Sequence, residues 1–149
     1  MQTLTSLADL VTTHGVPVDD HHDLNALVPV TDRLQFQGDV AVIPAGPAVQ
    51  ATGSGYPTPV PAQGVAVVRG ENGGNTHLLL DGRAPGADPV TWDPSRGGDT
   101  GLDLGVVTVP GGAVAYLAHP EHAYSGIAPG RYVIRRQREQ ADVIRLVAD

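Results

Sequence analysis

The chain has 149 residues, which is enough for one well-packed domain and too few for two ordinary ones. Its formal net charge of −7 argues against binding nucleic acid or an anionic membrane through the overall field of the protein. Cysteine is absent, which excludes disulfides, thiolate zinc sites and a cysteine nucleophile. We find neither a signal-peptide pattern nor an apolar run of membrane-spanning length, and we therefore expect a cytoplasmic protein.

The composition favours strands over helices. Val, Ala and Leu supply most of the apolar residues, and 19 Gly and 13 Pro interrupt the chain at short intervals. Few windows between them are long enough for a helix, whereas many suit a strand followed by a turn. We expect a mainly β fold, either a compact antiparallel barrel or a sandwich, cupin-like at most distantly, with a short N-terminal amphipathic helix.

Residues 1–30 are expected to form a helix and an arm, and residues 31–149 a single all-β domain. Four apolar residues recur at three- and four-residue spacing before Gly15, namely Leu4, Leu7, Leu10 and Val11. This spacing predicts a short helix that ends at the glycine and packs on a sheet or on a neighbouring subunit. The cluster Asp19-Asp20-His21-His22-Asp23 has metal-binding residue types, but adjacent side chains point apart, so we interpret it as a solvated loop.

Apolar runs separated by turn residues predict the strands of the all-β domain. They cover residues 34–44, 64–69, 76–80, 102–109, 113–118 and 131–138. In the first run Gly38 is expected to mark a bulge or a close approach by another backbone. The second and third runs flank an Asn/Gly-rich corner, and the fourth and fifth flank Pro110-Gly111-Gly112, so each pair is expected to form a hairpin.

Two polar corners carry residues that suit a metal ion. His119 and His122 lie in a short turn between predicted strands, and His77 ends the Asn/Gly-rich corner. Neutral imidazole binds zinc, iron and nickel, and three histidines with an open position are a familiar catalytic arrangement. If the corners meet, His77, His119 and His122 form a site for a divalent ion such as Zn, Fe, Ni or Mn. In the alternative interpretation these histidines form hydrogen bonds in partly exposed turns.

Charged residues near these corners suggest further roles. Glu121 suits a general acid/base or a group that orients a metal ligand, and Asp39 an extra ligand or orienting group. Arg136 and Arg138 share the parity of the apolar residues in their strand, so this strand could pass from the core into a polar cleft that holds a small anionic ligand. The competing interpretation pairs the arginines with the chain's own surplus carboxylates.

Two familiar enzyme patterns do not occur in the sequence. The chain has no Gly-x-Ser-x-Gly elbow, so a serine hydrolase finds no support. A cupin needs two alternating histidines on one strand, but Asn75 stands where the first would be, and His119 lies too far beyond Gly112. These residues are therefore compatible with a cupin only as a divergent, cupin-like barrel.

Five short pieces of the chain form an ordered pattern. They are Gln37-Gly38-Asp39-Val40, Gly74-Asn75-Thr76-His77, His119-Pro120-Glu121-His122, Pro129-Gly130-Arg131-Tyr132 and Arg136-Gln137-Arg138-Glu139. Over roughly residues 35 to 140 the pattern resembles an uncharacterised family of small bacterial and phage β-proteins. That family carries Gln-Gly-Asp-Val, Gly-His-x-His, His-x-Glu-His, Pro-Gly-x-Tyr and Arg-Gln-Arg-Glu. The resemblance implies no reaction, but it ties the three histidines to one pattern, from which Asn75 departs by removing a fourth.

These features support two interpretations of function. In the first, a histidine-lined site binds a divalent metal for catalysis or ligand binding, Glu121 moves protons, and Arg136 or Arg138 holds an anionic ligand. In the second, the protein is a non-enzymatic module that uses its N-terminal helix and arm to form a homo-oligomer or to dock on a protein partner. The sequence does not decide between an enzyme and a binding protein.

Overall fold

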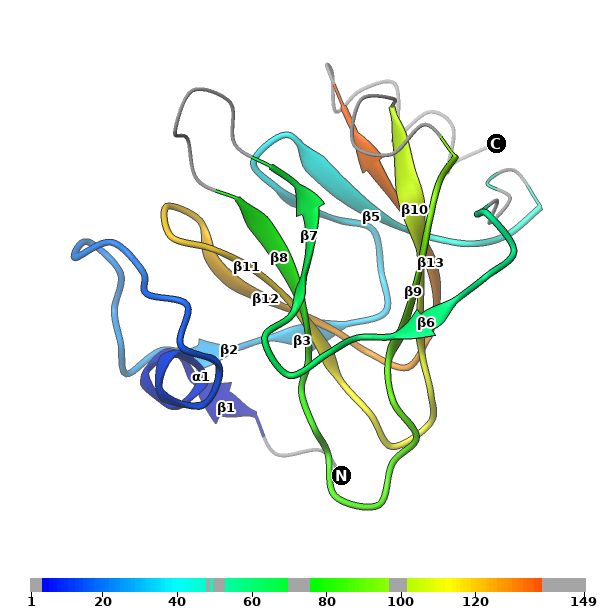
Figure 1. Cartoon of the computed structure of the whole chain (residues 1–149). Helices are drawn as coiled ribbons and strands as arrows, with labels where there is room; N and C mark the ends of the chain where they lie inside the picture. The colour runs from blue at the N-terminus through cyan, green and yellow to red at the C-terminus, as the bar shows by residue number, and fades with distance from the viewer. Residues whose placement is uncertain (1–3, 48, 50–52, 70–75, 97–101, 138–149) are drawn as a thin grey trace.

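A computed structural model gives the fold of residues 4–47, 49, 53–69, 76–96 and 102–137. The protein is mainly β, with three sheets and one short helix (Figure 1). The predicted mainly β fold with a short N-terminal helix is therefore confirmed. The barrel alternative is not supported, because within the described ranges the hydrogen-bonded order of each sheet runs from one edge strand to another without closing.

The largest sheet has six strands in the order β4-β5-β13-β10-β9-β6. All of its neighbouring strands are antiparallel. The strands are β4 (Gln35–Gln37), β5 (Val40–Pro44), β6 (Thr58–Pro59), β9 (Thr91–Pro94), β10 (Asp103–Val109) and β13 (Gly130–Arg136). β13 lies in the middle of this sheet, between β5 and β10.

The second sheet has five strands in the order β3-β12-β11-β8-β7, and a third pairs β1 with β2. Only the β3–β12 pair is parallel among these described strands. Their bounds are β1 (Thr5–Ser6), β2 (Leu27–Val28), β3 (Val30–Thr31), β7 (Val65–Val68), β8 (His77–Asp81), β11 (Ala115–His119) and β12 (Ala123–Ile127). Pairing of β7 with β8 confirms the first predicted hairpin.

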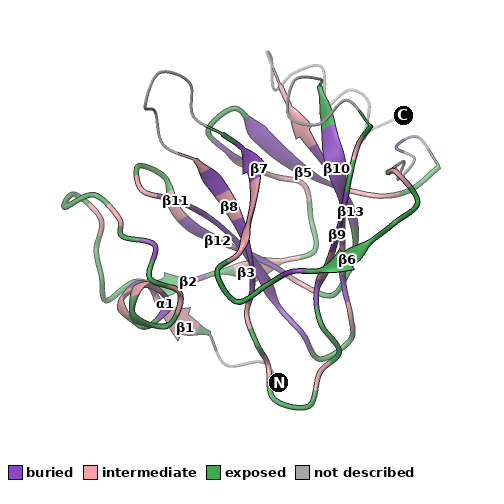
Figure 2. Ribbon diagram, in the orientation of Figure 1, coloured by how far each residue is buried: buried purple, intermediate pink, exposed green. Residues whose placement is uncertain are grey.

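The two larger sheets share one apolar core (Figure 2). Val42 and Ile134 enter it from the six-stranded sheet, and Leu79 and Leu117 enter it from the five-stranded sheet. Residues two apart on a strand face the same side, so the alternate residues of β8 and β11 face outward. Burial of this shared core holds the two sheets together, and polar side chains gather where the strands end.

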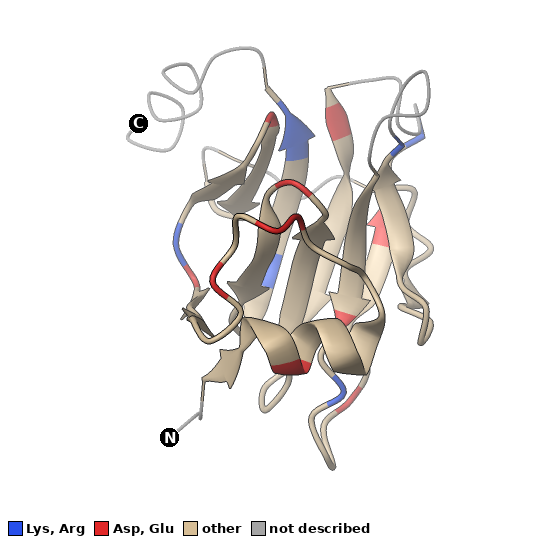
Figure 3. Ribbon diagram, turned by 90° about the vertical axis from the view of Figure 1, so that its left-hand side faces the viewer, with Lys and Arg blue, Asp and Glu red and all other residues tan. Residues whose placement is uncertain are grey.

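Helix α1 (Leu7–His14) packs on the outer face of the five-stranded sheet (Figure 3). The hydroxyl of Ser6 accepts a hydrogen bond from Asp9 N at 3.2 Å, and Gly15, with φ of 77°, ends the helix. The predicted glycine stop and the packing on a sheet are confirmed. In the described part of the chain no helix is long and apolar enough to cross a membrane.

Residues 34–44 form a hairpin rather than the single strand that we predicted. Gly38, with φ of 60°, and Asp39 form a tight turn that pairs Gln37 with Val40. The second predicted hairpin, across Pro110-Gly111-Gly112, is also wrong. β10 and β11 belong to different sheets, so this segment carries the chain from one sheet to the other.

A buried carboxylate secures the loop that precedes β6. Asp93 accepts hydrogen bonds from Ser54 N at 2.9 Å, Ser54 Oγ at 2.5 Å and Gly55 N at 3.1 Å. Burial acts to raise the pKa of Asp93, but the hydrogen bonds outweigh it and hold the pKa below its ordinary value of 3.8. The ionised carboxylate therefore stabilises the folded state above pH 3.8, and this stabilisation is lost as the pH falls through the lower folded-state pKa.

Asp93→Asn should lower the free energy of unfolding at neutral pH by about 1–3 kcal/mol, because the amide replaces a charged acceptor. The difference from wild type should be smaller at a pH below 3.8 than at neutral pH, because the stabilisation is lost as the pH falls through the lowered folded-state pKa. Urea unfolding at both pH values measures the effect, with Asp88→Asn, an exposed aspartate, as the control. An equal loss at both pH values would contradict the role of the ionised form.

Candidate metal site

The candidate site lies where β8 begins and β11 ends, on the inner side of the five-stranded sheet. The register that pairs Leu117 with Leu79, continued by two residues, places His119 opposite His77. Leu79 and Leu117 lie in the shared core, and the two histidines have the same parity. Both imidazoles therefore face the space between the two sheets.

The structure brings the three predicted histidines together. The ring centroids of His77 and His119 are 4.3 Å apart, those of His119 and His122 are 4.8 Å apart, and those of His77 and His122 are 6.1 Å apart. His77 and His119 are only 5% and 6% exposed, whereas His122 is exposed. The cluster thus extends from the end of the core to the rim of the molecule.

A more compact group has a different membership from the predicted one. Among the described residues, ligand atoms of His119, Glu121 and His122 all lie within 4.8 Å of one another. The sequence predicts that Glu121 transfers protons or orients a metal ligand, but its exposed carboxylate is close enough to the imidazoles to bind an ion with them. His77 lies behind this group and is not a member of it.

His77 is held in the neutral form. Burial lowers its pKa to about 4, assisted by His119 and His122 and opposed by Asp39 and the Gln37 backbone. The Nε2–H group donates to the carbonyl oxygen of Gln37 at 3.2 Å, because a carbonyl can only accept. The lone pair therefore resides on Nδ1, a buried atom without a hydrogen-bond partner among the described residues. Neutral imidazole is the form that binds metals.

Gln37 connects the six-stranded sheet to both strands that flank the histidine turn. Its side-chain Nε2 donates to Leu117 O at 2.8 Å, to Ala123 O at 3.2 Å and to Ser125 Oγ at 3.1 Å. The residue is 4% exposed, so these bonds form away from bulk water. The amide thereby fixes the β4–β5 hairpin against the turn that carries His122.

The turns that meet at the site have unusual backbone conformations. A Cβ atom on Gly38 would lie 2.8 Å from Nε2 of His122, so the glycine allows the imidazole to approach the β4–β5 turn. The predicted close approach at Gly38 is thus made by a side chain and not by a backbone. On the other side of the turn, Ala123 adopts φ of 65°, a left-handed conformation that costs a non-glycine residue about 1–2 kcal/mol.

Among the residues that the structure describes, the other charged ones that the sequence suggested for the site do not belong to the compact group of ligand atoms. Arg136 pairs with the core residue Val40 and so lies on the inner face of β13. Asp39 is exposed in the β4–β5 turn, and its carbonyl oxygen accepts a hydrogen bond from Gln137 N at 2.8 Å. Arg138 lies outside the described residues. On β13 the expected pairing of arginine with the chain's own carboxylates occurs at Arg135, whose Nε lies 2.8 Å from Oδ1 of Asp103.

The N-terminal arm reaches the histidine turn, a contact that we did not predict. Asp19 N donates to Pro120 O at 2.8 Å, and His22 Nε2 donates to Glu121 O at 2.7 Å. The arm is largely exposed, as predicted for residues 19–23. No sequence signal marks this contact, because both acceptors are backbone carbonyls far along the chain.

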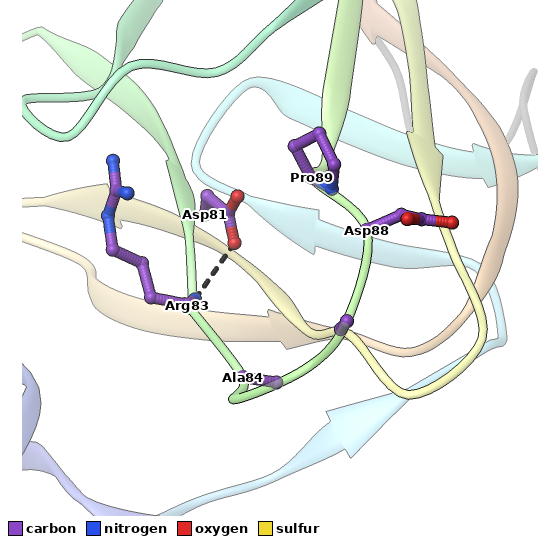
Figure 4. A pocket seen from close by; sticks show the side chains of 6 residues that line it. Asp81, Arg83, Ala84, Asp88 and Pro89 are labelled. Atoms are coloured by element: carbon purple, nitrogen blue, oxygen red, sulfur yellow. Dashed lines mark hydrogen bonds between the residues drawn. The ribbon is translucent and has the colours of Figure 1, made fainter.

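A cavity of about 250 Å³ lies at the opposite end of β8 from His77 (Figure 4). Its lining residues are Asp81, Arg83, Ala84, Ala87, Asp88 and Pro89. The Asp81 carboxylate is already engaged, since it accepts hydrogen bonds from Arg83 N at 2.8 Å and Val90 N at 3.3 Å. This carboxylate stabilises its own turn, and the histidine cluster remains the better candidate for chemistry.

The fold and the cluster define a mainly β domain with a candidate metal group at one end. The model of a domain of unknown function, DUF8820, matches residues 36–137, and the chain belongs to this family. The expected membership of an uncharacterised family is confirmed over nearly the same residues, whereas the bacterial and phage origin of its members stays a prediction. No curated protein and no solved structure matches the chain significantly.

Gly38→Ala should destabilise the protein by about 1–2 kcal/mol and displace the His122 ring, because the backbone is left-handed and the new methyl group meets the imidazole. Urea unfolding measures the first effect, and NMR spectra of the histidine side chains measure the second. Gly46→Ala is the control, since a Cβ there would meet no atom within 4 Å. If the two variants behave alike, the close approach of His122 to Gly38 is wrong.

Proposed function

We propose that this domain binds a divalent ion of zinc, iron, nickel or manganese through His119, Glu121 and His122, with His77 as a further imidazole. The observation that carries the proposal is the proximity of the first three residues, whose ligand atoms lie within 4.8 Å of one another. Two imidazoles and one carboxylate suit zinc and iron(II), which in such sites keep coordination positions open for water or substrate.

The state of His77 supports its inclusion. Its ring centroid is 4.3 Å from that of His119, and burial keeps the imidazole neutral with its lone pair on Nδ1. Zinc and iron bind the neutral imidazole, so no proton has to leave His77 when an ion binds. His77 thereby offers a deprotonated nitrogen at the inner end of a group in which His119 is also buried, whereas Glu121 and His122 are exposed.

Such a site would bind or activate an oxygen atom of a ligand. A divalent ion polarises a bound oxygen, and a carboxylate at its edge, here Glu121, can take or return a proton. Arg136 places a positive charge on the inner face of β13, which favours an anionic ligand. Arg138 remains a second candidate for this role. We assign the site to metal-dependent catalysis or ligand binding on a small anion.

The assembly interpretation has narrower support. Leu7 and Leu10 of α1 are buried against the chain's own sheet, so the apolar face of the helix is already covered. The observation in its favour is the exposure of three leucines in the N-terminal segment, at 41%, 48% and 59%, namely Leu4, Leu24 and Leu27. A homo-oligomer or a protein partner therefore stays a prediction.

Elemental analysis of protein purified without an affinity tag tests the metal proposal. The wild-type protein should contain one divalent ion per chain, and the His119→Ala/His122→Ala double variant should contain none. His77→Ala should bind zinc more weakly by at least about tenfold, because one neutral imidazole is lost. Equilibrium titration with zinc measures the affinity, and His14→Ala, a histidine outside the cluster, should match wild type.

A wild-type protein that binds no zinc, iron, nickel or manganese and stays folded in the presence of a chelator would refute the proposal. If His77→Ala binds zinc as tightly as wild type, His119, Glu121 and His122 suffice, and His77 must be removed from the ligand set.

A further inference from the structure

The segment from Val16 to His22, which we call the arm, lies along the turn that carries Glu121 and His122 (Figure 1). The Tyr124 hydroxyl donates to Val16 O at 2.9 Å, in a buried position just after the turn. Asp19 N donates to Pro120 O at 2.8 Å, and the His22 side chain donates to the next carbonyl at 2.7 Å. The arm therefore contacts two adjacent carbonyl groups of the turn and also the start of β12, just beyond the turn.

These hydrogen bonds hold the turn that carries Glu121 and His122, which is the part of the site least fixed by core packing. Glu121 and His122 are exposed, so core packing does not fix their backbone. Within the turn, Glu121 N donates to Nδ1 of His119 at 3.1 Å. Ala123, immediately after the turn, holds a left-handed conformation that surrounding contacts must maintain. The arm bonds the carbonyl groups of Pro120 and Glu121, which lie between the two histidines.

We infer that the arm is a positioning element of the metal site, with His22 as the positioning residue for Glu121 and His122. This inference rests on the proposed function. His22 acts through the backbone, because its Nε2 donates to the Glu121 carbonyl and leaves the Glu121 carboxylate available. The bond requires only an Nε2–H group, which imidazolium and one neutral tautomer both carry. The arm lies outside the residues that the family model matches, 36–137.

The adjacent histidine supplies a matched control. The ring of His21 lies 3.9 Å from that of His22, measured between centroids, but His21 is exposed. In the described part of the chain its side chain makes no hydrogen bond to the turn. Replacing His21 therefore removes a histidine side chain from the arm but keeps the hydrogen bond between His22 and the Glu121 carbonyl.

The arm also brings negative charge to the site. Asp19 and Asp20 of the arm and Asp23 just beyond it are exposed, and Figure 3 shows acidic segments in the loops on the face that carries α1. Negative charge near a cation site raises the local concentration of the cation. Salt screens this attraction, so its effect on affinity falls as the salt concentration increases. The His22 bond is short-range and directional, so its contribution to affinity should persist at high salt.

Cobalt(II) titration of the full chain at high salt tests the inference. His22→Ala should weaken cobalt binding by about tenfold, the lower end of the range for groups that orient metal ligands. His21→Ala should bind as wild type does. His22→Gln, whose amide can still donate to the Glu121 carbonyl, should recover part of the lost affinity. The visible spectrum of bound cobalt should be the same in all variants, because the arm contributes no ligand.

The outcomes separate the inference from the proposal on which it rests. A wild-type protein that binds no cobalt overturns both. If wild type binds cobalt and His22→Ala binds it equally well, the inference fails and the metal site stands. A changed cobalt spectrum in His22→Ala would make His22 a ligand, which also overturns its positioning role.

Discussion

The rest of the site depends on the hydrogen bonds that the side-chain amide of Gln37 donates. Apolar burial holds the two larger sheets together, but it is non-directional and does not set how the ends of the sheets face each other. The Gln37 amide supplies direction, because its Nε2 donates to acceptors on β11 and β12. The same residue accepts from His77 through its backbone carbonyl. Gln37 thus fixes the two strands that flank the histidine turn through its side chain, and the His77 ring through its backbone carbonyl.

This connection explains how buried and exposed groups share one site. The inner end lies against the core, so burial keeps His77 neutral. The outer end is a short turn whose backbone is held from both sides, by Gln37 at the carbonyl of Ala123 and by the arm at the carbonyl of Glu121. The left-handed conformation of Ala123 is maintained by these contacts and not by its own preference. Directional bonds to the backbone thus hold side chains that core packing does not reach.

Much of the fold could be predicted from local sequence patterns, and the errors of the prediction have identifiable physical causes. The helix and its glycine stop, the β7–β8 hairpin and the strand content depend on spacing and turn residues, which are visible in the sequence. Pro110-Gly111-Gly112 is equally compatible with a hairpin and with a connection between two sheets. Long-range packing selects the connection, since β10 and β11 lie in different sheets. The hairpin at Gly38 escaped prediction because apolar residues continue on both sides of a two-residue turn. The residue types of the site were foreseen, whereas the grouping of Glu121 with the imidazoles and the docking of the arm required the folded backbone.

Two of the five pieces of the sequence pattern, Pro129-Gly130-Arg131-Tyr132 and Gln37-Gly38-Asp39-Val40, lie near opposite ends of β13. Gly130 and Tyr132 lie at the end of β13 away from Arg136, where the Tyr132 hydroxyl donates to Ala128 O at 2.8 Å and closes the turn before the strand. At the other end, the β4–β5 turn needs a residue that accepts a left-handed conformation, for which asparagine would also serve. A Cβ at Gly38 would lie 2.8 Å from Nε2 of His122, so any side chain there would displace the imidazole. The turn and the imidazole therefore both favour glycine, and the contact with the imidazole ties this position to the site.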